Sequence, residues 1–131
     1  MSEIITDKLT GKTSAGDVDV TSEGGAVTMQ LQQGLAKAWV YGVGTGTIAI
    51  QDSFNIASIS DSGTGEYGNN FTSSMNSASY PVHFEGHNSI RPACIDSNET
   101  QTSSSCFGNY YAKESARDAE FFCSSIHGDL A

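Results

Sequence analysis

No segment of this sequence holds the roughly 20 consecutive apolar residues that a helix needs to cross a lipid bilayer. Residues 1–7 lack the basic start and the apolar middle of a secretion signal. Basic residues are also scarce: 6 Lys and Arg stand against 15 Asp and Glu, which gives a formal net charge of -9. Such a charge repels nucleic-acid phosphates and anionic membrane surfaces. We therefore expect no nucleic-acid partner and no membrane insertion.

Long runs of the strong helix formers Leu, Ala, Glu and Lys are missing, and there are only 2 Pro. Ser, Thr, Gly and Asn are abundant instead, a composition typical of short strands joined by turns. With 131 residues, the chain is long enough for one ordinary domain and too short for two independent ones. The composition therefore predicts an all-β protein.

Apolar and polar residues alternate with a period of two in several pieces of the sequence, the pattern of strands with one buried face. The pieces that we expect to be strands are 35–41, 47–51, 54–60, 67–72, 79–86, 108–112 and 118–129. Their spacing of about ten residues favours an antiparallel β-sandwich or a jelly-roll-like module. Trp39 and Tyr41 alternate with smaller residues, so we expect the first strand to bury at least one aromatic face. Residues 88–105, rich in Ser, Asn and Thr, are expected to form an exposed loop.

The first 34 residues are polar and rich in turns, and alternating pieces such as 17–20 and 26–31 are very short. Strands of this length bury too little surface to be stable alone. We therefore expect a short extended N-terminal arm, residues 1–34, that serves attachment or oligomerisation and is stabilised by symmetry mates or a larger assembly. A β-rich body domain, residues 35–131, is expected to follow it.

The glycines Gly42, Gly44 and Gly46 imitate a phosphate-binding loop. Such a loop needs a helix after it, whose N-terminus faces the phosphate, and residues 48–50 have the pattern of a strand instead. The glycines therefore predict a turn or a bulge.

His83, Glu85 and His87 are spaced by two, so a regular strand would place all three on one face as candidate ligands for zinc. A solvent-facing strand gives the same pattern, Gly86 can interrupt the strand, and a fourth ligand is not evident. We therefore predict no metal site.

No serine lies in a Gly-x-Ser-x-Gly elbow, and the cysteines show no nucleophile signature. The carboxylates are scattered, so no acid and base pair can be chosen. We expect no enzyme activity, no catalytic residue and no cofactor.

A disulfide between Cys94 and Cys106 would close the Ser-rich loop, whereas reduced thiols, Cys123 included, are usual in a protein assembled in a cytoplasm. The sequence leaves both alternatives open.

Four residues near the Ser-rich loop are candidates for contact with a receptor or glycan: Arg91, Phe107, Tyr110 and Tyr111. Aromatic rings offer sugar-binding surface, but aromatic residues on strands are more often part of the core. Both interpretations stay open.

Several segments together resemble a module of tail-fibre and appendage proteins of tailed phages, especially those of marine bacteria. The segments that carry the resemblance are 35–40, 44–50, 52–55 and 61–65, with a similar lead-in at 9–16 and 21–33 and a similar closing strand at 118–129. The sequence departs from the usual form of the family at residues 41–43 and in the loop from Cys94 to Cys106. The resemblance implies a virion protein, a homotrimer with a β-rich body, and no catalytic residues.

We therefore expect a structural protein of a phage virion, assembled in the host cytoplasm, that forms part of a surface appendage or tail fibre and contacts the host. One alternative is a decoration protein, or head fibre, on the capsid surface. A second alternative is a glycan-binding module for receptor recognition. The expected partners are two further copies of the chain, other virion proteins, and a host glycan or receptor.

Overall fold

A computed structural model describes residues 3–12, 18–21, 24–25, 28–86, 91–92, 101–112 and 115–131, with only the backbone described for 91–92, 109–112 and 115. The chain divides into an N-terminal unit, Met1–Leu35, and a body unit, Ala36–Ala131. The predicted all-β fold is confirmed, since the described part contains antiparallel sheets and, as its only helical element, the 3-10 turn η1 (Gln32–Gly34). No helix in these ranges is long and apolar enough to span a membrane.

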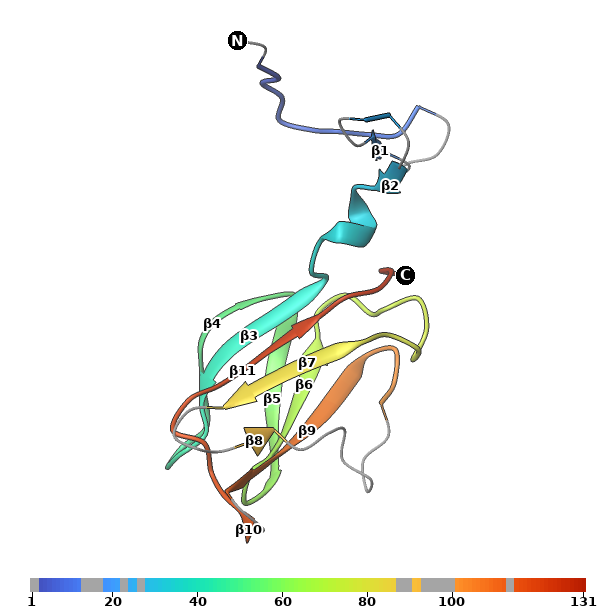
Figure 1. The fold of residues 1–131 in the computed structure, drawn as a ribbon. Helices are drawn as coiled ribbons and strands as arrows, with labels where there is room; N and C mark the ends of the chain where they lie inside the picture. Colours follow the sequence, from blue (N-terminus) through green and yellow to red (C-terminus); the bar gives the residue numbers. More distant parts are fainter. Residues whose placement is uncertain are drawn as a thin grey trace. The chain divides into compact units, whose positions relative to one another are not determined.

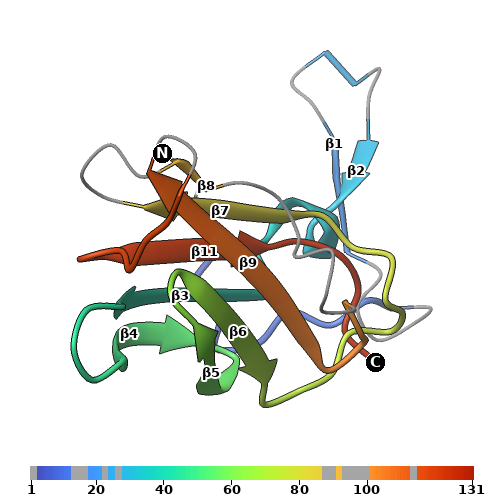
Figure 2. The same ribbon diagram turned by 90° about the horizontal axis from the view of Figure 1, so that it is seen from below.

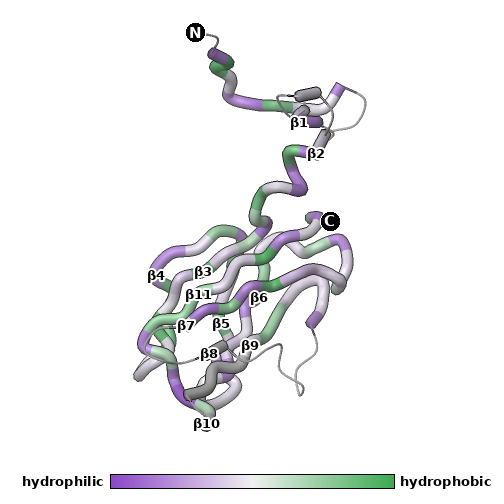
Figure 3. Tube along the Cα trace, viewed as in Figure 1, coloured by the Kyte–Doolittle hydropathy of each residue, from purple (hydrophilic) through white to green (hydrophobic). Residues whose placement is uncertain are grey.

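The N-terminal unit has one small sheet. Strands β1 (Asp19–Thr21) and β2 (Thr28–Gln30) pair antiparallel, and all their residues are exposed. Apolar and polar residues follow one another along the unit (Figure 3). Its exposed apolar side chains are Ile4, Ile5, Leu9, Val20, Met29 and Leu35. Every buried hydrophobic residue of the described chain lies in the body unit, so the N-terminal unit has no core of its own there.

The body unit consists of two antiparallel sheets, an arrangement consistent with a β-sandwich (Figure 1). Sheet I has the strand order β4-β3-β11-β7, with bounds β3 (Ala38–Val43), β4 (Ala49–Phe54), β7 (Val82–Gly86) and β11 (Phe122–Ile126). Sheet II has the order β10-β9-β6-β5, with β8 also paired to β9, and bounds β5 (Ile56–Gly63), β6 (Glu66–Phe71), β8 (Arg91–Pro92), β9 (Ser105–Ala112) and β10 (Ser115–Ala116). In Figure 2, β9 of sheet II crosses in front of β7 and β11 of sheet I.

The core lies between the two sheets. Along β11 every second residue is buried, and Phe122 and Ile126 contribute its apolar side chains. Phe122 stacks on Tyr67 of sheet II, with ring centroids 4.6 Å apart. Ile126 belongs to a second cluster that contains Phe71 of sheet II. The period-two pattern of the sequence thus reports which side chains enter the core.

Glycines provide space for aromatic rings in this core. A Cβ on Gly42 would lie 2.7 Å from the ring of Phe122, and a Cβ on Gly108 would lie 2.7 Å from the ring of Phe84. These distances are too short for any larger residue without a shift of the ring. Strand glycines here serve close packing rather than chain reversal.

The prediction that Gly42, Gly44 and Gly46 form a turn or bulge is confirmed. The register between β3 and β4 shifts at Tyr41 and Gly42, and Gly46 has a φ of 72 degrees in the connection between the two strands. The strand β4 follows this segment, so the helix that a phosphate-binding loop requires is not there.

The loop predicted at 88–105 contains a short strand. Residues Arg91–Pro92 form β8 and pair with β9, which itself begins at Ser105. Residues 93–100, and with them Cys94, lie outside the described residues. Cys106 and Cys123 are both thiols rather than disulfide sulfurs.

Candidate functional site

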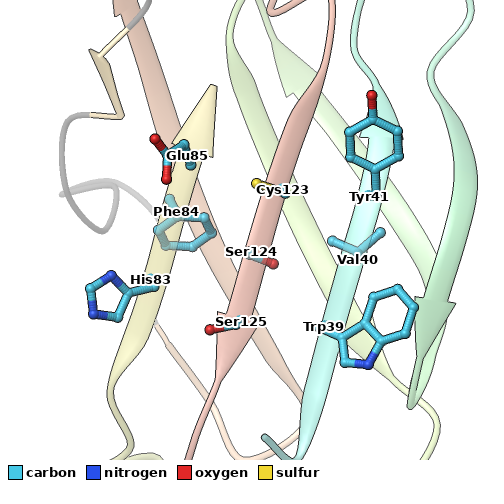
Figure 4. Close-up of a pocket in the computed structure, with 9 residues that line it drawn as sticks. All are labelled: Trp39, Val40, Tyr41, His83, Phe84, Glu85, Cys123, Ser124 and Ser125. Atoms are coloured by element: carbon cyan, nitrogen blue, oxygen red, sulfur yellow. The ribbon is translucent and has the colours of Figure 1, made fainter. Parts of the chain in front are cut away.

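The outer face of sheet I carries a hollow of about 310 Å³ (Figure 4). The described residues that line it are Trp39, Val40, Tyr41, His83, Phe84, Glu85, Cys123, Ser124 and Ser125. All of them come from the three neighbouring strands β3, β11 and β7. We call this hollow the sheet I groove.

The register of the three strands explains the shape of the groove. One row across the sheet runs from His83 through Ser125 to Trp39. The next runs from Glu85 through Cys123 to Tyr41. The central strand β11 therefore presents small side chains, while larger side chains stand on both flanking strands. This alternation of large, small and large leaves the floor of the groove on β11.

The side chains of strand β3 face the opposite way to the one that the sequence suggested. The expectation of a buried aromatic face is wrong: Ala38 and Val40 are buried, whereas Trp39 is only partly buried and Tyr41 is 43% exposed. The inner face must accommodate the stacked rings of Tyr67 and Phe122 from other strands. Small side chains on the inner face of β3 leave this space, so its aromatic residues face outward.

An aromatic pair extends the groove along β11. The ring of Tyr41 stacks on Phe121 with centroids 5.5 Å apart and an interplanar angle of 10 degrees. A second hollow, of about 240 Å³, lies beside this pair and shares Tyr41, Glu85 and Cys123 with the first. On the other flank, Phe54 of β4 pairs with Trp39 and is 51% exposed. The face therefore combines aromatic surface with polar groups.

The groove carries negative rather than positive charge. Among the described residues that line it, Glu85 is the only acidic side chain, and there is no Lys or Arg. Burial raises the pKa of the Cys123 thiol, and the negative charge of Glu85 raises it further. Because the chain as a whole carries a net charge of -9, the groove does not favour anionic ligands.

Cys123 is expected to react with iodoacetamide in the native protein, whereas Cys106 is expected to stay protected. Cys123 is partly exposed in the groove, but Cys106 is fully buried, and burial raises its pKa to about 11. Since the thiolate is the reactive form, Glu85→Gln should lower the pKa of Cys123 and speed its alkylation severalfold at pH 8.

Timed alkylation followed by mass spectrometry would measure both rates, in a Cys94→Ser background that removes the third thiol. Glu66→Gln is the matched control, because Glu66 lies on β6 of sheet II. Equal alkylation rates for Glu85→Gln and the parent protein would show that the carboxylate does not act on this thiol.

The structure describes two of the three candidate metal ligands. His83 and Glu85 both line the groove, as their spacing of two on a strand predicts, whereas His87 lies outside the described residues. No group of three or more His, Cys, Asp or Glu side chains suited to a metal occurs in the described part of the chain.

The four residues predicted to contact a receptor or glycan lie at the other sheet. Phe107 is on β9 of sheet II, where its ring covers Gly68: a Cβ there would lie 2.3 Å from the ring. For Arg91, Tyr110 and Tyr111 only the backbone is described, and it places Arg91 opposite Tyr111 on neighbouring strands. The contact surface itself stays a prediction.

Sequence reasoning did not find the groove. Residues 39–41, 83–85 and 121–125 belong to separate predicted strands, and only the pairing of β11 with both β3 and β7 brings their side chains together. The shared spacing of two in each segment was the available signal, but it does not reveal which strands are neighbours. Comparisons of the chain with known protein families, with curated proteins and with solved structures found no match.

Proposed function

We propose that this chain is a non-enzymatic structural subunit of a tailed-phage virion, in a surface appendage or tail fibre that contacts the host. The N-terminal unit attaches the subunit to the particle and to two further copies in a homotrimer, and the body unit is presented to the surroundings. The lack of a core among the described residues of the N-terminal unit is the observation that supports this division most directly.

The exposure of the apolar residues in the N-terminal unit argues for a partner. Ile4 and Ile5 are each 86% exposed, and Leu9 is 59% exposed. The β1-β2 hairpin has only three residue pairs, and a hairpin of this size is marginally stable in water at best. Burial against neighbouring chains would remove this apolar surface from water. Each Å² of apolar surface buried contributes a stabilising free energy of about 25 cal/mol. A unit of this kind is suited to assembly.

Removal of residues 1–34 is expected to leave a folded body that no longer joins virions. The body unit keeps every described core residue, so its melting temperature should change by less than about 4 °C. A shift of that size corresponds to a change of about 1 kcal/mol in the free energy of unfolding. Quantitative mass spectrometry of purified particles measures incorporation. The full-length variant Phe54→Ala, changed in an exposed residue of the body, is the control and should be incorporated normally. Incorporation of the truncated chain at its normal copy number would overturn the attachment role.

A capsid-surface decoration protein, or head fibre, is the second candidate, favoured by the small size of the chain and its net charge of -9. The two locations differ in copy number and symmetry. Cryo-electron microscopy of intact particles would show many copies over the capsid for a decoration protein and a few copies on the tail for a fibre.

A further inference from the structure

We propose that the sheet I groove binds an uncharged saccharide, with the aromatic rings of β3 on one side and Glu85 and His83 of β7 on the other. As a host-contact site this inference rests on the proposed virion function, while the binding chemistry is a property of the groove itself. The site lies on sheet I, whereas the residues near the Ser-rich loop that the sequence suggested for glycan contact belong to strands β8 and β9 of sheet II.

The size of the groove suits a small ligand. Its volume of about 310 Å³ falls at the lower end of small-molecule pockets, which run from about 300 to 1,000 Å³. The adjoining hollow of about 240 Å³ continues it past Tyr41 toward Phe121. Two neighbouring hollows that share Tyr41, Glu85 and Cys123 have room for a short chain of sugar rings, one ring in each.

The aromatic pair supplies the surface on which a sugar ring packs. One face of a pyranose ring presents C–H bonds with a small positive charge, and these are attracted to the negative face of an aromatic ring. Stacking on Phe121 fixes the plane of the Tyr41 ring, so binding would cost little side-chain entropy there. Tyr41 also carries a hydroxyl at the end of this ring.

The polar groups match the hydroxyls of a sugar. Glu85 only accepts hydrogen bonds, the Trp39 indole only donates them, and the hydroxyl of Ser125 does both. Hydroxyls of a saccharide also donate and accept, so they can satisfy such a mixed set. A phosphate or an acidic sugar would face Glu85 with like charge and would find no Lys or Arg among the described lining residues.

Charge also argues against a second copy of the chain as the occupant. Asp52 of β4 pairs with Tyr41, in the same row as Glu85, so two copies of this face would bring carboxylates together. Like charges at an interface oppose association. An uncharged saccharide avoids this repulsion and uses the same aromatic surface.

The test uses the full chain and three classes of oligosaccharide probe. Maltotriose, cellotriose and chitotriose are uncharged, a glucosamine trimer is basic, and sialyllactose is acidic. Affinity is measured by calorimetric titration, and alkylation of Cys123 reports locally on occupancy because this thiol lies on the groove floor. At least one uncharged probe is expected to bind and to slow the alkylation of Cys123 in a dose-dependent manner.

Variants locate the binding. Tyr41→Ala and Glu85→Gln are each expected to weaken binding about tenfold, and Ser125→Tyr, which fills the groove, should abolish it. Glu66→Gln, which changes a residue on β6 of sheet II, is the control and should change affinity less than about twofold. The double variant of Tyr110→Ala with Tyr111→Ala should also bind normally. Circular dichroism and thermal melting confirm that each variant is folded, and Glu85→Gln and Ser125→Tyr change outward-facing positions.

Three results would overturn the inference: no binding of any uncharged probe at its highest soluble concentration, binding of charged probes alone, or affinity that a folded Ser125→Tyr variant leaves unchanged. Failure of this inference is separable from failure of the proposed function. A chain found in virions that binds no uncharged probe overturns the groove assignment alone. A chain that binds an uncharged saccharide but is missing from virions overturns the virion function alone.

Discussion

Gly44→Ala is expected to destabilise the body unit by about 3 to 5 kcal/mol, because the new methyl group would overlap the hydroxyl of Tyr67 and break its buried hydrogen bonds. The Cβ would lie 2.1 Å from the Tyr67 Oη and 2.8 Å from the Ala119 carbonyl oxygen. That hydroxyl donates to the Gly44 carbonyl over 3.2 Å and accepts from the Ala119 N–H over 3.0 Å. Burial raises the pKa of Tyr67 to about 12, so it remains a donor at neutral pH.

Urea denaturation of Gly44→Ala and of a matched variant, Gly46→Ala, would test this. Gly46 has a φ of 72 degrees, and a Cβ added there would meet no atom within 4 Å, so alanine should cost only about 1 to 2 kcal/mol of backbone strain. In a Tyr67→Phe background the hydroxyl and its hydrogen bonds are already absent, but the ring Cζ would still lie 2.4 Å from the new Cβ. The Gly44→Ala penalty should therefore fall by about 1 kcal/mol without disappearing. Equal penalties at Gly44 and Gly46 would refute the steric explanation.

Much of the fold was predictable because strands with one buried face repeat every two residues. The predicted strand at 54–60 corresponds to β5 (Ile56–Gly63), and the one at 67–72 corresponds to β6 (Glu66–Phe71). The division of strands between sheets was not predictable. The first and last strands of sheet I along the chain, β3 and β11, lie side by side although about 80 residues separate them, and alternation alone does not specify a partner.

The same limit applies to the site. The sequence drew attention to Phe107 because aromatic residues gather near it, but in the structure its ring covers Gly68. Trp39 and Tyr41 were expected to face the core because large aromatic rings are usually buried. Their outward orientation follows from rings that other strands bring into the core, above all Tyr67 and Phe122. A local pattern cannot report such a competition for space.

Asn55 forms the corner at which the chain passes from sheet I to sheet II. Its replacement should cause the second large loss of stability. It has a φ of 57 degrees, and no other described non-glycine residue has a positive φ. Its Nδ2 donates to the carbonyl oxygens of Lys37 and Ser73, each over 3.0 Å, and its Oδ1 accepts from the Ser73 N–H over 2.7 Å. One side chain thus connects the start of β3, the corner itself and the segment after β6.

Asn55→Ala is expected to destabilise the body unit by about 3 to 4 kcal/mol, since three hydrogen bonds are lost and alanine is strained at a positive φ. Asn55→Gly loses the same hydrogen bonds without the strain, so its penalty should be smaller by about 1 kcal/mol. Asn55→Asp keeps the acceptor for Ser73 but places a carboxylate beside two carbonyl oxygens, and it should not restore stability. Urea midpoints of the three variants give these differences directly. If alanine and glycine were equally destabilising, the positive φ would carry no cost, and if aspartate matched the parent protein, the two donated hydrogen bonds would not hold the corner.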